Sequence, residues 1–177
     1  MFDSMGLCAI GRIFSDTSAE RQRLLDTIND VLDDPNVQPN QPATGNAWCN
    51  RAAERIIDNM GYNTDPILDW EDTGEPDIDW TSANEMAENA ANAADDPNSG
   101  VSEVTEQEAR DLANAGTPVL AVAENPSGDH GHAGVVAPSD GDTTMIGQSG
   151  ADPGIRSLSE SFPENFDVHF YTLPREE

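Results

Sequence analysis

Apolar residues recur at helical spacing through the first two thirds of the chain. Leu24, Leu25, Ile28, Val31 and Leu32 stand at positions i, i+1, i+4, i+7 and i+8, which is the stripe of an amphipathic helix. Further segments show similar stripes, and cap residues, glycine or proline bound them. We therefore expect helices over about residues 18–33, 48–60, 82–94 and 105–115. The last of these opens on a capping box formed by Thr105 and Glu108.

After Gly116 the pattern changes to alternation or to short continuous apolar runs. Phe166, Val168 and Phe170 alternate with polar residues, as in a strand with one buried face. Short connections containing glycine favour antiparallel neighbours. We expect strands over residues 119–123, 132–137, 143–148 and 166–173. Helices followed by an antiparallel β-meander make an α+β fold in one domain.

Two segments do not fit this scheme. Residues 1–17 have no clear period, and we interpret them as an N-terminal arm or short strand, with the domain over 18–177. Residues 62–80 are acidic and interrupted by Pro66, Gly74 and Pro76, which indicates a surface insert.

The charge of the chain excludes several partners. Eight basic residues, all arginine, stand against 34 acidic ones, for a net charge of −26. A field of this sign repels nucleic acid and anionic membranes, and no apolar run is long enough for a membrane-spanning helix. Abundant aspartate without lysine resembles the proteins of salt-loving archaea and their viruses, and we expect a halophilic source.

The N-terminal sequence and the cysteine content bear on targeting and on disulfide bonds. The uncharged stretch from Met5 to Gly11 is too short for a signal-peptide core, so we expect no cleaved signal peptide. Cys8 and Cys49 are too few for a disulfide scaffold, although a bridge between them stays open.

The candidate chemistry lies where a turn over residues 45–48 runs into the second helix. A thiol at Cys49 would feel the free N–H groups of the helix start, which favour thiolate, so we expect a lowered thiol pKa. His132 opens a strand and can accept the thiol proton. Gln148, on the next strand, can hold the imidazole.

Plainer interpretations of the same residues stay open. Cys49 also suits a small apolar core position, and His132 and Gln148 also suit ordinary hydrogen-bonded strand residues. His130 becomes the base if its strand starts sooner, because residues i and i+2 share a face.

Three sequence features carry a resemblance to a known family. They are the Trp-Cys-Asn triplet at 48–50, the segment ANAGTPVLAVAENPSGDHGHAGVV at 113–136, and MIGQSG at 145–150. Over roughly residues 40–172 the chain resembles the NlpC-like and CHAP-like cysteine amidohydrolases of papain-like fold, which are peptidoglycan hydrolases, many of them carried by phages. The resemblance implies Cys49 as nucleophile, His132 as general base and Gln148 as orienting residue. It implies no cofactor and no metal.

Other candidate site residues surround this set. Asn46, with the Cys49 backbone N–H, is our candidate for the oxyanion hole. Trp48, Trp70 and Trp80 are candidates for substrate binding, and the last two also suit packing of the insert. A loop with many carboxylates suits Ca²⁺, but a solvated acidic face is the simpler interpretation. The carboxylates concerned are Asp65, Asp69, Glu71, Asp72, Asp77 and Asp79.

We expect a cysteine peptidase or amidase that cleaves an amide bond in a cell-envelope polymer or glycoprotein. The expected location is a virion, as a tail or baseplate component assembled through the N-terminal arm, or the extracellular space. The alternative is a non-catalytic adaptor of a viral tail that uses the same fold.

The charge also predicts that stability depends on salt. Repulsion among carboxylates is screened as the Debye length falls from about 10 Å at 0.1 M salt to about 3 Å at 1 M. We expect the melting temperature, followed by circular dichroism, to rise between about 0.1 M and about 3 M salt. A melting temperature that is constant over this range contradicts the interpretation.

Overall fold

The structure of the chain is a computed structural model that describes residues 6–35, 37, 48–68, 81–128, 130–150 and 152–176, with side chains from Thr17 onward. One six-stranded antiparallel sheet forms its centre, in the order β1-β6-β2-β3-β4-β5. The strands are β1 Ser102–Val104, β2 Leu120–Ala123, β3 His132–Ala137, β4 Met145–Gln148, β5 Gly154–Ser157 and β6 His169–Thr172. The helices are α1 Gly6–Asp33, α2 Cys49–Asn59, α3 Ala83–Asp95, α4 Glu106–Asn114 and α5 Leu158–Ser161, with a 3-10 turn η1 at Asp65–Ile67.

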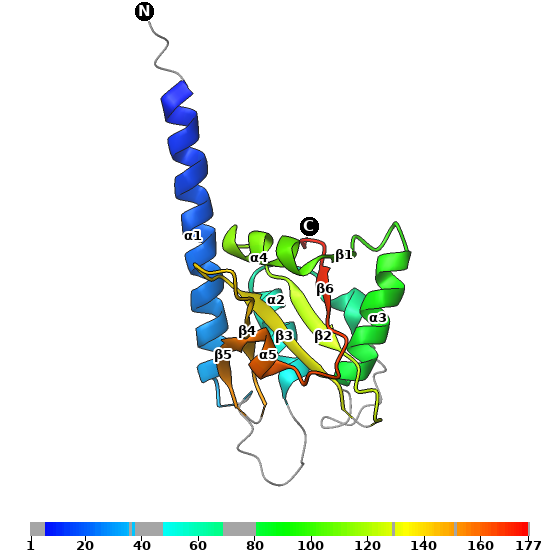
Figure 1. The fold of residues 1–177 in the computed structure, drawn as a ribbon. Coiled ribbons are helices and arrows are strands. Elements are labelled where there is room, and N and C mark those ends of the chain that lie inside the picture. The colour runs from blue at the N-terminus through cyan, green and yellow to red at the C-terminus, as the bar shows by residue number, and fades with distance from the viewer. Residues whose placement is uncertain are drawn as a thin grey trace, which may run out of the picture.

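Strand register defines two faces of the sheet. Val122 pairs with Ala133, and Val135 pairs with Gly147, so these residues share one face. A Cβ on Gly147 would lie 2.5 Å from Ile28 Cγ2, which shows that α1 packs directly on this face. The helices α1, α2 and α3 cover it (Figure 1). We call it the helix-covered face.

The opposite face carries the residues of the other alternation. His132 pairs with Ala123, and a Cβ on Gly134 would meet Ile146 and Gln148. Gln148 and His132 therefore both point to this opposite face. The short helix α5 follows β5 and lies over this side (Figure 1).

The hydrophobic core lies between the sheet and the helices of the helix-covered face. Leu24 and Ile28 of α1, Ile56 of α2, and Leu120 and Val135 of the sheet are all fully buried. Burial of side chains of this size contributes about 1.5–3 kcal/mol each. The amphipathic stripes of the sequence are therefore the inner faces of α1 and α2.

The α+β class and most elements are confirmed. Helices at 49–59, 83–95 and 106–114 lie where the apolar stripes predict them, and strand β3 matches its predicted bounds. The capping box of Thr105 and Glu108 is formed in both directions. The short strands β1 and β5 and helix α5 were not predicted.

Two expectations about the fold are wrong. Residues 6–17 are not a strand, because α1 begins at Gly6 and runs without interruption to Asp33 (Figure 1). The last predicted strand begins only at His169, and it pairs with β1 and β2. The meander is therefore β2-β3-β4-β5, and β6 pairs with the edge of β2 that faces away from β3.

Within the described ranges, no helix is both long enough and apolar enough to cross a membrane. Among the same residues, no group of three or more histidine, cysteine or acidic side chains is placed to hold a metal ion. Of the insert, residues 62–68 are described and include η1. The carboxylates of Asp69, Glu71, Asp72, Asp77 and Asp79 lie outside the described residues.

Candidate active site

Cys49 is the first residue of α2. The side chain of Trp48, the N-cap residue, makes no capping hydrogen bond to this helix. The backbone N–H groups of Asn50 and of Cys49 itself face the sulfur. The thiol is free, and the residue is 3% exposed.

The N–H of Ala133 lies close enough to the Cys49 sulfur to lower the thiol pKa in part. Val136 N donates to Val119 O, so Val136 forms a hydrogen-bonded pair with the chain of β2. Such pairs alternate along an antiparallel ladder, and Ala133, three residues earlier, therefore makes no backbone hydrogen bond to β2. Its N–H points away from β2, toward the β4 side. Strand β4 ends at Gln148, one residue before the partner that Ala133 would need. The Cys49 sulfur lies near this N–H, at the end of β4.

His132 is held by Gln148. Gln148 Nε2 donates to the Asp152 carbonyl at 3.2 Å, so the amide oxygen is the atom that faces the imidazole. His132 Nε2 donates to this Oε1. The neutral ring therefore carries its proton on Nε2 and leaves the lone pair on Nδ1.

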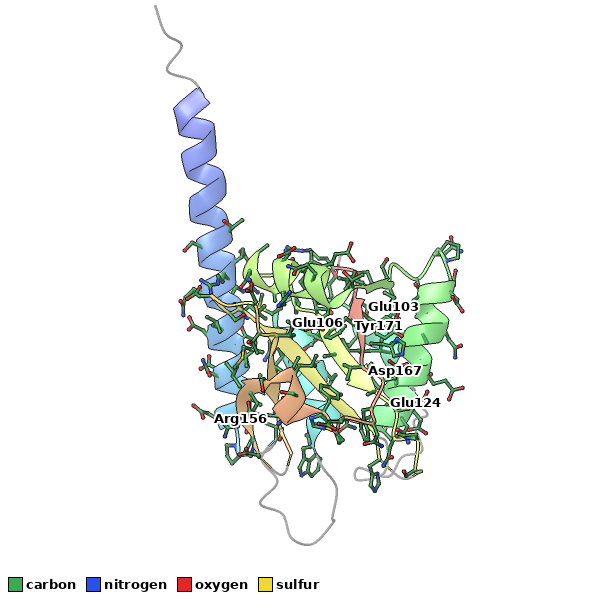
Figure 2. The ribbon with its side chains drawn as sticks, in the orientation of Figure 1. Glu103, Glu106, Glu124, Arg156, Asp167 and Tyr171 are labelled. Carbon is green, nitrogen blue, oxygen red and sulfur yellow. The ribbon has the colours of Figure 1, made fainter. Side chains whose placement is uncertain are left out.

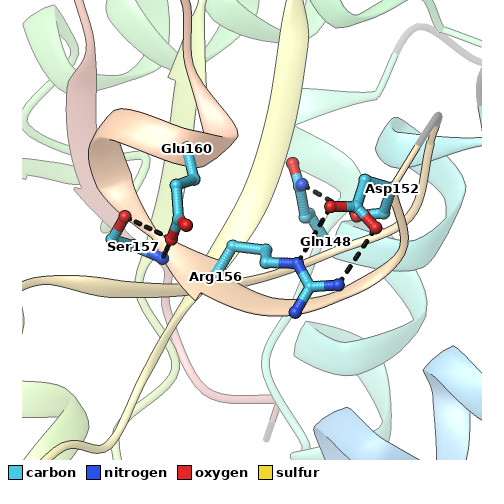
Figure 3. Close-up of polar contacts among 5 residues, drawn as sticks. All are labelled: Gln148, Asp152, Arg156, Ser157 and Glu160. Carbon is cyan, nitrogen blue, oxygen red and sulfur yellow. Dashed lines mark hydrogen bonds and ion pairs between the residues drawn. The ribbon is translucent and has the colours of Figure 1, made fainter.

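The loop after Gln148 is clamped by an ion pair. Arg156 binds both carboxylate oxygens of Asp152, at 3.1 Å and 3.0 Å (Figure 3). The Arg156 guanidinium lowers the pKa of the Asp152 carboxyl. The clamp fixes the peptide whose carbonyl orients Gln148, and the capping box of Ser157 and Glu160 begins α5 beside it (Figure 3).

An aromatic contact packs the imidazole from the side of α5. The rings of Phe162 and His132 meet edge to face, with centroids 5.0 Å apart. A Cβ on Gly150 would lie only 3.7 Å from His132 Cε1. Burial lowers the pKa of His132, and the hydrogen bond to Gln148 raises it by less. The ring therefore favours its neutral form, which is the form that accepts a proton.

The expected lowering of the thiol pKa is wrong. Burial raises the pKa of Cys49, and the N–H groups of Ala133, Asn50 and Cys49 offset only part of this effect. Desolvation of a thiolate outweighs the helix N-terminus because the sulfur has almost no contact with water. The resting pair is a neutral thiol beside a neutral imidazole.

The three candidate residues come from two sides of the sheet. Helix α2 lies on the helix-covered face, whereas His132 and Gln148 point to the opposite face. The Cys49 sulfur lies near the N–H of Ala133, the residue that follows His132. Although both residues are described, no hydrogen bond joins the Cys49 sulfur to the His132 ring.

Of the other residues that the sequence suggested for the site, some lie outside the described residues, whereas Trp48 and His130 are described. Asn46, Trp70 and Trp80 lie outside the described residues, as does the side chain of Cys8. Trp48 is partly buried, and the Arg51 guanidinium lies 5.1 Å from its ring centroid. His130 is exposed in the loop before β3, and Gln148 contacts His132 instead.

The sequence matches no protein-family model and no curated protein.

Sequence reasoning missed the groups that support the three candidates. The Ala133 N–H has no sequence signal, because its availability depends on where β4 ends. The clamp and Phe162 belong to β5 and α5, whose capping box, Ser157 with Glu160, has the same spacing as Thr105 with Glu108. That spacing was the available signal for α5.

The orientation of His132 is testable by nuclear magnetic resonance of the imidazole nitrogens. We expect a proton on Nε2, and a pKa below the ordinary histidine value of 6.5 because burial disfavours the charged ring. Gln148→Leu should lower this pKa further, because the variant loses the acceptor that stabilises imidazolium.

Gln107→Leu, on the exposed surface of α4, is the matched control and should leave the His132 pKa unchanged. A proton on Nδ1, or a pKa that rises in Gln148→Leu, contradicts the orientation described here.

Proposed function

We propose that the protein is a cysteine hydrolase of papain-like fold that cleaves an amide bond. The observation that supports the proposal is that Gln148 accepts the Nε2 proton of His132, which leaves the lone pair on Nδ1, while the Cys49 sulfur lies near the N–H of the adjacent residue, Ala133. The order of a helix-borne cysteine, a strand histidine and a polar residue on the following strand supports the papain-like assignment.

The reaction proceeds by acyl transfer through sulfur. His132 Nδ1 takes the thiol proton of Cys49 as the sulfur attacks the carbonyl carbon, and a tetrahedral intermediate forms. The imidazolium returns the proton to the amine nitrogen, the C–N bond breaks, and a thioester remains. Water, deprotonated by His132, then hydrolyses the thioester and restores the thiol.

Two groups assist without taking part in bond exchange. Gln148 is a positioning residue, because it fixes the tautomer and the plane of the His132 ring. In this proposal the Cys49 backbone N–H, at the positive end of α2, donates to the oxyanion on the attacked carbonyl.

The neutral resting pair affects the timing of proton transfer. Burial opposes both thiolate and imidazolium, so the ion pair is not the ground state. The proton moves as substrate approaches and negative charge passes to the substrate oxygen. The enzyme is therefore least reactive toward small thiol reagents when no substrate is present.

For the substrate we propose a peptide cross-link or other amide in a cell-envelope polymer or glycoprotein. The support is the resemblance to envelope amidohydrolases together with the acidic, lysine-free composition. The composition suits function in concentrated salt, and we propose a component of a halophilic virus particle, such as a tail-tip or baseplate hydrolase.

The burial of Cys49 favours a second candidate function. A thiol with 3% exposure, raised pKa and no hydrogen bond to His132 also suits a core residue of a non-catalytic tail adaptor. In that case His132, Gln148 and Phe162 stabilise the sheet edge and nothing more.

Mutant kinetics on envelope material separate the two functions. New amino groups released from isolated envelopes are measured with an amine-reactive dye in concentrated salt. Cys49→Ser and His132→Ala should each lower the rate by about 10³-fold or more, and Gln148→Ala by about 10- to 100-fold. Because burial lowers the His132 pKa, the acid limb of kcat/KM should lie below pH 6.5, where protonation removes the base.

Cys8→Ser is the matched control and should keep the wild-type rate. Release that persists in folded Cys49→Ser and His132→Ala protein, or no release from any envelope preparation, supports the adaptor.

A further inference from the structure

The first turn of α3 is bound to both chain segments that carry the proposed nucleophile and base. The turn is itself well fixed, because Ser82 and Glu85 form a capping box. Ser82 N donates to Glu85 Oε2 at 2.7 Å, and Glu85 N donates to Ser82 Oγ at 3.2 Å. Two N–H groups are thus satisfied within the turn, which makes it a firm attachment point for its neighbours.

One attachment joins this turn to the start of α2. Asn50 follows Cys49 in the first turn of α2, and its Nδ2 donates to the carbonyl of Thr81, the residue before the N-cap of α3. Thr81 is buried, so water competes little for this hydrogen bond. The bond therefore ties the helix that carries the thiol to the beginning of α3.

A second attachment joins the same turn to the loop between β2 and β3. Asn84 Oδ1 accepts from Asn125 N at 3.0 Å, and Asn84 Nδ2 donates to the Gly128 carbonyl at 3.1 Å. Figure 2 shows Glu124, which follows β2, beside α3. Because one amide binds both a donor and an acceptor of the loop, it fixes the position and the orientation of the chain that leads into β3.

The close approach of Gly131 shows how tightly this chain lies against α3. A Cβ on Gly131 would lie 2.5 Å from Asn84 Oδ1 and 2.4 Å from the Ala123 carbonyl oxygen. No side chain fits in such a space, so the position requires glycine. Gly131 directly precedes His132, and the proposed base is therefore one residue away from a direct contact with α3.

We propose that the first turn of α3 is a brace that positions Cys49 and His132 relative to each other, with Asn50 and Asn84 as its positioning residues. The inference rests on the proposed hydrolase function, because it concerns the placement of that reaction's nucleophile and base. The two side-chain amides bind backbone groups rather than the reacting atoms, and they act through the segments that they hold.

Asn84→Ala tests the brace by kinetics. Without the amide the chain before His132 gains freedom, and the base is displaced from the thiol. We expect kcat for amine release from envelopes to fall by about 10- to 100-fold with KM nearly unchanged, because misplacement of a catalytic group by about 1 Å costs about 100-fold. Wild-type kcat in folded Asn84→Ala overturns the brace.

The same variant is tested without turnover by nuclear magnetic resonance of the imidazole. Burial lowers the pKa of His132, and a looser loop admits water to the ring. The His132 pKa in folded Asn84→Ala should therefore rise toward its ordinary value. A loss of global stability alone would leave the pKa of the folded protein unchanged.

The α2 side of the brace is tested by alkylation of the thiol. In a Cys8→Ser background, Asn50→Ala should raise the rate of Cys49 alkylation by iodoacetamide more than about threefold, because local opening exposes the buried sulfur. Mass spectrometry of the folded protein follows the reaction. An alkylation rate equal to that of the Cys8→Ser parent contradicts this half of the brace.

Asn89→Ala is the matched control. It makes the same substitution in the same helix, and Asn89 Nδ2 also donates to a backbone carbonyl, that of Ile67. It should keep the wild-type kcat, His132 pKa and alkylation rate. Asn84→Asp keeps the acceptor for Asn125 but loses the donor to Gly128, so it should fall between Asn84→Ala and the wild type. It also carries the test if Asn84→Ala does not fold.

The brace is overturned if the His132 pKa in folded Asn84→Ala and Asn84→Asp equals the wild-type value, or if Asn89→Ala shifts it equally. The resonance and alkylation measurements need no turnover. They therefore decide the brace even if the wild-type protein releases no amine, a result that would overturn the proposed function alone.

Discussion

The backbone N–H of Ala133 is the group on which the candidate site depends. It is free because β4 ends at Gln148 and leaves one ladder position of β3 without a strand partner. The Cys49 sulfur lies near this N–H, which offsets part of the rise that burial causes in the thiol pKa. The start of α2, on one face of the sheet, therefore lies close to the residue that follows His132, whose imidazole points to the other face.

Charge is tolerated at the surface of the molecule and disfavoured in the candidate site. The surface carries most of a net charge of −26, and solvent and salt screen it. The site is dry, and burial opposes charge on both Cys49 and His132. Arg156 and Asp152 form an ion pair that is exposed to solvent, where water stabilises both charges. This pair fixes the loop whose Asp152 carbonyl orients Gln148. The charges of Arg156 and Asp152 thus help to orient the neutral side chains of the candidate site, although both charged groups lie outside that site.

Sequence periodicity was sufficient for elements whose apolar faces are local, such as the stripe from Leu24 to Leu32 and strand β3. It failed for β1 and β5, which are short and only partly buried, so no regular pattern marks them. The order of the strands was sufficient to predict the contact between His132 and Gln148. The role of Cys49 stays a prediction. The raised thiol pKa was beyond sequence reasoning, because burial of the sulfur depends on how α2 and the sheet pack together.

A crystal structure of the protein alkylated at Cys49 with chloroacetamide tests the central claim most directly. We expect the sulfur to remain beside the Ala133 N–H, His132 Nδ1 to lie within about 3.5 Å of the reacting atoms, and the amide oxygen to accept a hydrogen bond from the Cys49 N–H. Gln148 should still accept from His132 Nε2. If Nδ1 is turned away from the sulfur in the alkylated protein, the three residues do not form a catalytic set.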